Sequence, residues 1–322
     1  RYPLPGSNLA EWQPALLHHA TTGRVIEMSR STLKAALIQD INHGDADANL
    51  SVIEQRVAEA AAAGAELVLL QELHNGAYFC QHESAAEFDR AEAIPGPSTE
   101  RLSALAAKNS VVLIASLFER RAAGLYHNTA VVFEKDGSLL GKYRKMHIPD
   151  DPGFYEKFYF TPGDLGFHPI ASSVGKIGVL VCWDQWYPEA ARLMALAGAE
   201  VLVYPTAIGW DPDDTSDERG RQRQAWMLSH RGHAVANGIP VLSCNRTGFE
   251  PSPIGASGIR FWGSSHALGP QGEILAEAGT DTPEILYATL DLARSEQVRR
   301  MWPFLRDRRI DAYADLLKRY RD

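Results

Sequence analysis

The sequence predicts a layered α/β fold in which apolar strands alternate with helices. From residue 33 onward, runs of strand and helix character follow one another as strand 33–39, helix 47–63, strand 65–72, helix 98–108 and strand 111–118. Two more apolar runs, 126–134 and 138–144, are joined by Asp136-Gly137, a favoured hairpin turn, so we expect a mixed sheet. The chain of 322 residues is 45% hydrophobic, which is enough for one large core.

The second half of the chain repeats this alternation. Its predicted elements are a strand at 175–181, a helix at 187–198, a strand at 200–204, a long helix around 219–237, strands at 240–245, 262–268, 273–278 and 286–291, and a helix around 309–320. No linker rich in Pro, Gly or Ser interrupts the pattern. We therefore predict a single domain over residues 32–322.

Residues 1–31 differ from the rest of the chain. The segment contains Pro3, Pro5 and Pro14 and has no strand pattern, while Met28 stands just before the first strand. Its short apolar run lacks the basic start and the length of a signal peptide. We interpret it as a disordered extension or a vector-derived segment, with Met28 as a possible native start.

Composition argues against several classes of protein. The net charge is −8 and no basic block is present, which argues against nucleic acid as a partner. No stretch approaches the roughly 20 apolar residues of a membrane span. The three cysteines, Cys80, Cys182 and Cys244, form no C-x-x-C pair and lack metal-type histidine spacing. We expect a cytoplasmic protein with free thiols and neither metal nor cofactor.

Cys182 is the first candidate for a functional residue. It ends the apolar run Ile177-Gly-Val-Leu-Val-Cys182, and Pro188 can occupy the first turn of the following helix. At such a strand-to-helix turn the unpaired N–H groups favour a thiolate and a developing oxyanion. The alternative is that Cys182 is only a small buried apolar residue.

Glu72 and Lys145 also lie at the ends of predicted strands. Glu72 closes the run Leu67-Val-Leu-Leu-Gln-Glu72. Lys145 lies between Tyr143 and Met146, at the end of the predicted strand 138–144. Because ligands bind at the carboxyl ends of strands in α/β sheets, Glu72 should project into the same space as Cys182 and could act as a general base. Taken alone, Glu72 could instead be a solvated strand end and Lys145 a surface charge.

Together these blocks resemble the nitrilase superfamily of carbon-nitrogen hydrolases, which use a Glu-Lys-Cys triad. Gln71-Glu72, Tyr143-Arg-Lys145-Met-His and Val181-Cys182-Trp-Asp occur in the order of that family, and the match extends from about residue 33 to the C-terminus. The resemblance implies a four-layer αββα sandwich with mixed sheets. It also implies a homo-oligomer, a dimer or larger, in which the C-terminal strand and helix extend towards a neighbouring subunit.

Further stretches resemble one branch of that family, the N-carbamoylputrescine amidases. They are Gln71–Gln81, His147–Asp164, Tyr204–Gly209 and Phe304–Tyr313, although Ile310 stands where that branch would have proline. The implied substrate is a small carbamoyl amine, hydrolysed to putrescine, CO2 and ammonia through a thioester. Rival activities on the same triad are those of a β-ureidopropionase, an ω-amidase or a nitrilase. From other classes, the chain could be a catalytically silent interaction module or a polyamine-binding protein.

The mechanism expected from this resemblance assigns a role to each residue. Glu72 is the base for Cys182, and the Lys145 ammonium and the backbone N–H of Trp183 stabilise the oxyanion. Glu156 is a candidate second carboxylate near the triad, with a plain loop salt bridge as the alternative.

Substrate contacts are expected on the loop after Lys145. Its cation-binding candidates are Asp150, Asp151, Phe154 and Tyr155. The tryptophans that could wall the pocket are Trp183, Trp186 and Trp210. Solvation of the loop and packing of the core explain these two groups nearly as well. His147 is a weaker candidate for a base, because the sequence indicates no Asp or Asn partner for it.

Overall fold

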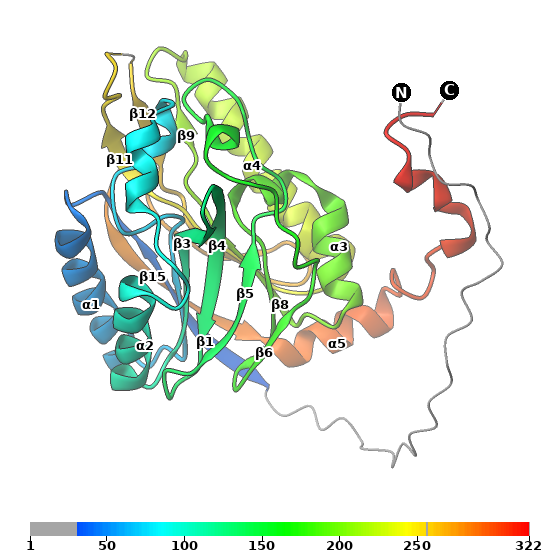
Figure 1. The fold of residues 1–322 in the computed structure, drawn as a ribbon. Helices are drawn as coiled ribbons and strands as arrows, with labels where there is room; N and C mark the ends of the chain where they lie inside the picture. The colour runs from blue at the N-terminus through cyan, green and yellow to red at the C-terminus, as the bar shows by residue number, and fades with distance from the viewer. Residues whose placement is uncertain (1–30, 256, 322) are drawn as a thin grey trace.

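Two six-stranded mixed sheets, stacked face to face, form the centre of the protein (Figure 1). The computed structural model describes residues 31–255 and 257–321, so the predicted extension lies outside the described residues except for Ser31. The first sheet has the strand order β15-β1-β2-β3-β4-β5. Its strands are β1 (Thr32–Gln39), β2 (Leu67–Leu70), β3 (Val112–Ala122), β4 (Leu125–Phe133), β5 (Leu139–Arg144) and β15 (Glu284–Asp291).

The second sheet repeats the topology of the first, with the order β14-β13-β10-β8-β7-β6. In each sheet the three central strands are parallel to one another. One antiparallel strand lies on one side of them, and on the other side lie two strands, each antiparallel to the strand before it. The strands of the second sheet are β6 (Ile170–Ser172), β7 (Gly175–Val179), β8 (Val201–Pro205), β10 (Val241–Cys244), β13 (His266–Leu268) and β14 (Ile274–Glu277). A small third sheet contains β9 (Gly209–Trp210), β11 (Thr247–Glu250) and β12 (Ile259–Trp262).

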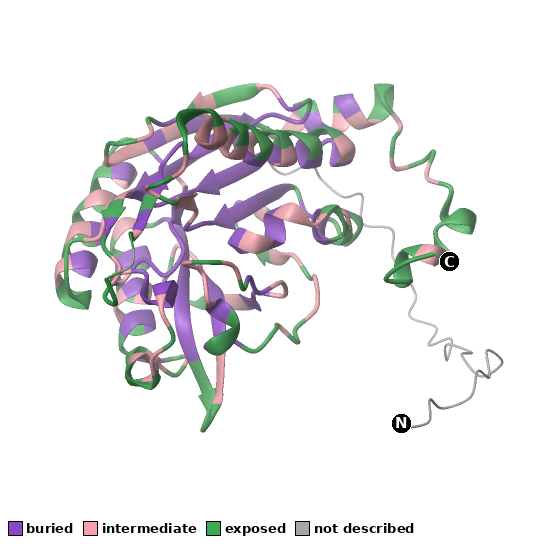
Figure 2. Cartoon of the chain, turned by 90° about the horizontal axis from the view of Figure 1, so that it is seen from above, coloured by how far each residue is buried: buried purple, intermediate pink, exposed green. Residues whose placement is uncertain are grey.

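Helices cover the outer faces of both large sheets (Figure 1), which gives the four-layer αββα sandwich that the family resemblance implies. Alternation along β1 shows the layering: Leu33, Ala35 and Leu37 pack in the cluster between the sheets, whereas Ala36 and Ile38 pack against α1 and α2. Buried strands therefore lie at the centre, and exposed residues lie on the outer helix surfaces (Figure 2). The helices are α1 (Ala46–Ala62), α2 (Pro97–Asn109), α3 (Pro188–Leu196), α4 (Ser216–Asn237) and α5 (Leu292–Met301).

Local sequence signals explain where these helices begin and end. Asp45 caps α1 by accepting a hydrogen bond from the backbone N–H of Ala48 at 2.9 Å. As predicted, Pro188 occupies the first turn of α3, where a missing N–H carries no penalty. Gly238 ends α4 in the left-handed conformation, with φ +61°.

The structure departs from the sequence prediction in several places. It contains β6, β9, β11 and α5, which the sequence analysis did not predict. The predicted strand 262–268 is divided into β12 and β13, because Gly263 (φ +51°) and Ser264 (φ +55°) turn the chain between them. The predicted helix at 309–320 is wrong. The chain instead leaves the body after α5 and forms two short 3₁₀ turns, η5 (Ile310–Ala312) and η6 (Ala314–Leu317) (Figure 1).

The stacking of the sheets brings together the strand ends that carry the candidate residues. Glu72 follows β2 of the first sheet, and Cys182 follows β7 of the second. The backbone N–H of Glu72 donates to the carbonyl of Thr206, just after β8, at 3.3 Å. This bond joins the two sheets at the edge where the site forms.

Candidate active site

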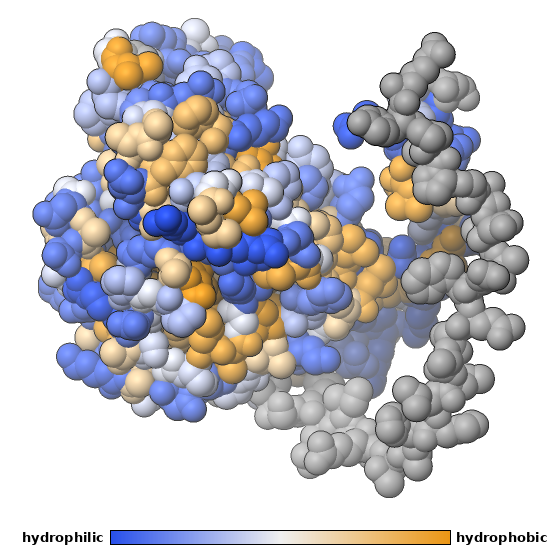
Figure 3. Space-filling view, in the orientation of Figure 1, coloured by the Kyte–Doolittle hydropathy of each residue, from blue (hydrophilic) through white to orange (hydrophobic). Residues whose placement is uncertain are grey.

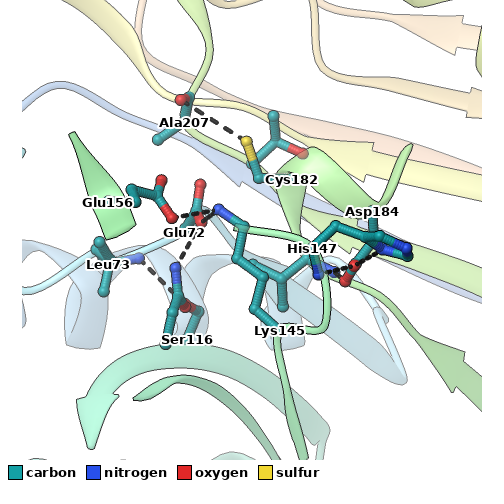
Figure 4. A network of polar contacts seen from close by, with 12 residues as sticks. Glu72, Leu73, Ser116, Lys145, His147, Glu156, Cys182, Asp184 and Ala207 are labelled. Atoms are coloured by element: carbon teal, nitrogen blue, oxygen red, sulfur yellow. Dashed lines mark hydrogen bonds and ion pairs between the residues drawn. The ribbon is translucent and has the colours of Figure 1, made fainter. Parts of the chain in front are cut away.

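Cys182 lies in a strained turn between β7 and α3. It begins the 3₁₀ turn η4 (Cys182–Trp186), and its φ of +42° is unusual for a residue other than glycine. Such a conformation costs about 1–3 kcal/mol, and it persists where surrounding contacts enforce it. The side chain is 4% exposed, and Sγ lies 3.8 Å from the carbonyl oxygen of Ala207. The turn therefore presents the sulfur towards the space beside Ala207 (Figure 4).

Lys145 lies between two buried carboxylates. Its Nζ donates to Glu72 Oε1 at 2.8 Å and to Glu156 Oε2 at 2.6 Å (Figure 4). Asn128 Nδ2 also donates to Glu72 Oε1, at 2.6 Å, and Tyr78 Oη donates to Glu156 Oε1, at 2.7 Å. Glu72 Oε2 is buried and has no hydrogen-bond partner among the described residues. This oxygen is therefore available to exchange a proton.

Burial and the opposite charges nearby act in opposite directions on the pKa values of Lys145 and Glu156. Burial alone would lower the pKa of Lys145, but the carboxylates of Glu156 and Glu72 outweigh it and raise that pKa well above its ordinary value. Burial, together with the nearby Glu72, raises the pKa of Glu156 to about 7, although Lys145 and Tyr78 oppose the shift. Lys145 is accordingly an ammonium at neutral pH.

Burial opposes the Cys182 thiolate that the turn is predicted to favour. Burial raises the pKa of the Cys182 thiol well above its ordinary value, and the negative charge of Glu72 raises it further, with Lys145 opposing. The thiol is therefore protonated at neutral pH. A nucleophilic role for Cys182 requires a base, and this requirement agrees with the role predicted for Glu72.

A buried arginine holds the loop that carries Glu72. Arg246 is fully buried and donates to the carbonyl oxygens of Glu72 (3.3 Å), Leu73 (2.8 Å) and Gly76 (2.9 Å). It also pairs with Glu250 at 2.5 Å. The sequence analysis missed Arg246, although a charged residue directly after the buried strand β10 is the same signal that identified Glu72.

A cavity of about 520 Å³ opens onto Cys182 and Glu156. Four of the predicted substrate-contact or wall residues line it: Asp151, Phe154, Trp183 and Trp186. Three other predicted residues do not line the cavity. Asp150 is exposed, Tyr155 bonds through its backbone N–H to the Cys80 carbonyl, and Trp210 packs behind the wall against Trp262.

The cavity also has lining residues that the sequence analysis did not identify, including Asp211, Asp214, Gln222 and Trp262. Asp151, Asp211 and Asp214 make no ion pair with any described residue, and no Lys or Arg is among the residues that line the cavity. One oxygen of Asp151 is buried without a hydrogen-bond partner in the described chain. The charged part of the wall is thus entirely acidic.

His147 has the acidic partner that the sequence did not indicate. Its Nδ1 lies 2.7 Å from Asp184 Oδ1, and its ring stacks on Tyr187 at 3.7 Å. In Figure 4 the imidazole is directed towards Asp184, whereas the sulfur of Cys182 is directed towards Ala207. This orientation favours Glu72, not His147, as the base for Cys182.

Residues 31–255 and 257–321 contain neither a cluster of metal ligands nor a membrane-spanning helix. No group of three or more His, Cys, Asp or Glu side chains there could hold a metal ion. Within the same ranges no helix has the length and apolar character needed to cross a bilayer.

Known proteins are similar to this chain in sequence and in fold. The family model for carbon-nitrogen hydrolases matches residues 34–300. An N-carbamoylputrescine amidase from Arabidopsis thaliana is 44% identical over 92% of this chain and 97% of that protein. A citrullinase from Francisella tularensis subsp. tularensis is 41% identical over 90% of this chain and 100% of that protein. A carbon-nitrogen hydrolase from Helicobacter pylori G27 superposes with a TM-score of 0.88 at 57% identity, over 90% of this chain and all of that one. The chain belongs to the carbon-nitrogen hydrolase family, and the resemblance to the nitrilase superfamily is confirmed.

Proposed function

We propose that this enzyme hydrolyses N-carbamoylputrescine to putrescine, CO2 and ammonia through a thioester on Cys182, without metal or cofactor. One observation carries the proposal: the cavity above Cys182 has an entirely acidic charged wall, formed by Asp151, Asp211 and Asp214. A carbamoyl amine brings a reactive ureido group to the nucleophile and a distal ammonium to these carboxylates. The similarity to the Arabidopsis amidase supports the same substrate.

The proposed reaction uses the contacts of the triad. Glu72 takes the thiol proton as Cys182 Sγ attacks the ureido carbon, and it then gives that proton to the departing putrescine nitrogen. A carbamoyl thioester remains on Cys182. Glu72 next removes a proton from water, and the resulting hydroxide attacks the thioester and releases carbamic acid, which decomposes to CO2 and ammonia. The thiolate recovers its proton from Glu72.

Lys145 and Glu156 complete this mechanism. The Lys145 ammonium, with the backbone N–H of Trp183, stabilises the oxyanion formed at each attack. Glu156 also accepts a hydrogen bond from the ammonium, at 2.6 Å. Because Glu156 also lines the cavity, it is placed to orient either Lys145 or a ureido nitrogen.

The acidic wall also distinguishes the rival substrates. The substrates expected for a β-ureidopropionase or an ω-amidase end in a carboxylate, and citrulline carries a carboxylate beside its ammonium. The carboxylates of Asp151, Asp211 and Asp214 would repel a carboxylate of the substrate unless a cation lay between them. None of the residues that line the cavity is a Lys or Arg that could supply this cation. A diamine end has no such group and is favoured.

A substrate panel tests the proposal. We expect ammonia release from N-carbamoylputrescine and much slower release from citrulline, N-carbamoyl-β-alanine, a simple amide and a nitrile. Cys182→Ala should release none from any of them. Preference for a carboxylate-bearing substrate would contradict the acidic-wall argument while keeping the triad. Absence of turnover with the whole panel would instead favour a silent module, or a polyamine-binding protein if putrescine binds.

Variants of the cavity wall test which carboxylates contact the distal ammonium of the substrate. Asp211→Asn and Asp214→Asn should each raise the KM for N-carbamoylputrescine about tenfold, a conservative effect for losing a charged hydrogen bond. Asp213 lies between them in the sequence, is exposed and does not line the cavity, so Asp213→Asn is the matched control. Equal KM values in all three variants would remove the assignment.

We also infer that a second copy of this chain covers the apolar face of α3 and α4. Leu193, Leu196 and Leu228 are 44%, 49% and 68% exposed there, beside a groove of about 920 Å³ that the C-terminal segment helps to line. Apolar residues gather on the side of the body that faces this segment (Figure 3). Trp186 lines both this groove and the active-site cavity, so the partner would also support the wall of the site.

The oligomer has a direct test. Sedimentation velocity should show a dimer or a larger assembly, and Leu228→Asp should shift it towards the monomer, because a charge would be buried at the interface. Leu139→Asp is the control, since Leu139 is 41% exposed on β5. A monomeric wild type, or equal effects of both substitutions, would contradict the inference.

The cellular location that we propose is the cytoplasm. Cys80, Cys182 and Cys244 are all free and buried, which agrees with a reducing compartment. The proposed chemistry also requires Cys182 to remain a thiol.

A further inference from the structure

One buried carboxylate contacts the chain on both sides of Lys145. Asp184 Oδ2 accepts a hydrogen bond from Tyr143 Oη at 2.8 Å, and Oδ1 accepts from the backbone N–H of His147 at 3.0 Å. His147 Nδ1 lies 2.7 Å from the same Oδ1. Tyr143, Lys145 and His147 are alternate residues, so the two that Asp184 holds flank the lysine in the sequence. Figure 4 shows Asp184 beside His147.

The same carboxylate also contacts the turn of the nucleophile. Asp184 Oδ2 accepts from the backbone N–H of Val181 at 2.9 Å, while the Asp184 N–H donates to the Val181 carbonyl at 3.0 Å. These two bonds close the turn around Cys182, the residue with φ +42°. Asp184 is fully buried, so water does not compete for its oxygens.

We propose that Asp184 is a positioning residue that fixes the Lys145 ammonium relative to Cys182. Lys145 follows β5 of the first sheet and Cys182 follows β7 of the second, and among the described residues no hydrogen bond joins their side chains. Asp184 contacts the backbone or side chains next to both residues. Since a displacement of about 1 Å can cost about 100-fold in rate, a fixed separation has a direct catalytic consequence. The proposal rests on the proposed roles of Lys145 and Cys182.

Tyr143→Phe is the mildest test, because it removes one hydrogen bond to Asp184 and keeps the buried ring. We expect kcat to fall about tenfold with KM within twofold of wild type, because the substrate wall is untouched. Asp184→Asn removes the charge that organises all four bonds and should lower kcat about 100-fold. The matched control is Tyr204→Phe: Tyr204 is also fully buried, but its hydroxyl has no hydrogen-bond partner among the described residues. It should leave kcat unchanged.

A double-mutant cycle separates positioning from a general structural role. In a Lys145→Ala background, Tyr143→Phe should reduce kcat much less than it does alone, because the ammonium that it positions is gone. Additive losses, or a wild-type kcat in Tyr143→Phe, would overturn the proposal. Thermal unfolding of each variant shows whether it is folded.

A readout without substrate keeps this test separate from the proposed function. Lys145 lowers the pKa of the Cys182 thiol, so a displaced ammonium should slow iodoacetamide labelling of Cys182, followed by peptide mass spectrometry. We expect slower labelling in Tyr143→Phe and unchanged labelling in Tyr204→Phe. Unchanged labelling in both would contradict the positioning role even if the true substrate differs from N-carbamoylputrescine. Failure of the substrate panel with the labelling difference intact would contradict only the proposed substrate.

Discussion

Replacing Lys145 with alanine is expected to slow ammonia release about 100-fold or more, because one preformed oxyanion donor contributes about 3 kcal/mol to transition-state stabilisation. Loss of the ammonium also leaves Glu72 and Glu156 facing each other in a fully buried site. Breaking a buried pair in this way costs about 3–5 kcal/mol of stability. The measurements are steady-state kinetics and the free energy of unfolding in urea.

The stability loss should depend on pH with a definite sign. The folded-state pKa of Glu156, about 7, lies above its ordinary value of 4.5, so its contribution to stability is full below that value and declines as pH rises through 7. Lys145 opposes this upward shift, and Lys145→Ala removes the opposition. The variant should therefore be less stable than wild type by a larger margin at pH 8 than at pH 5.

Lys142→Ala is the matched control for that variant. Lys142 lies on β5 three residues earlier and pairs with Glu119 at 2.7 Å, but Arg144 also holds Glu119 through two hydrogen bonds. Its removal leaves Glu119 paired and should change the rate little. Near-normal turnover in Lys145→Ala, or an equal loss in Lys142→Ala, would remove the oxyanion role of Lys145.

The sequence predicted the strand ends of the site well, because each ends an apolar run that only a sheet interior can accommodate. Glu72 and Cys182 follow such runs, and Lys145 follows the second strand of a hairpin whose turn is local, so the pattern needs no knowledge of distant contacts. Pro188 marked the start of α3 in the same local way. What could be predicted was therefore the part of the site that is determined by neighbours in the sequence.

The substrate wall could not be predicted in the same way. Asp211 and Asp214 follow β9, a strand of two residues that exists because Trp210 pairs with Arg260, fifty positions later. No periodicity in the sequence signals such a short strand. The loop 149–160 was nearer to Lys145 and richer in signals, so Asp150 and Tyr155 were predicted as substrate contacts, whereas Asp211 and Asp214, which line the cavity, were not. The helix expected at 309–320 failed for a related reason: its apolar residues, such as Leu317 at 95% exposure, are not buried in a core formed by the described residues.

Glu72→Gln is expected to lower kcat by about 10²–10⁴, the range for loss of a positioned general base. The amide keeps the size of the side chain and can still accept from Lys145 and Asn128 through its oxygen, which are the contacts of Oε1. It cannot take the thiol proton at the Oε2 position. Because burial keeps the Cys182 thiol protonated, its attack needs a base, and the variant lacks that base. KM should stay close to wild type.

Glu156→Gln is the comparison that gives this result its meaning, because both carboxylates contact the same ammonium. Both oxygens of Glu156 already accept hydrogen bonds, from Lys145 and Tyr78, so it has no free oxygen with which to receive the thiol proton. Protonation of Glu156 displaces one of these donors, so wild-type kcat should fall as pH decreases through about 7. Glu156→Gln should lose this pH dependence and retain more activity than Glu72→Gln. If the two variants lose activity equally at every pH, the carboxylates act as one unit, and the assignment of Glu72 as the sole base is wrong.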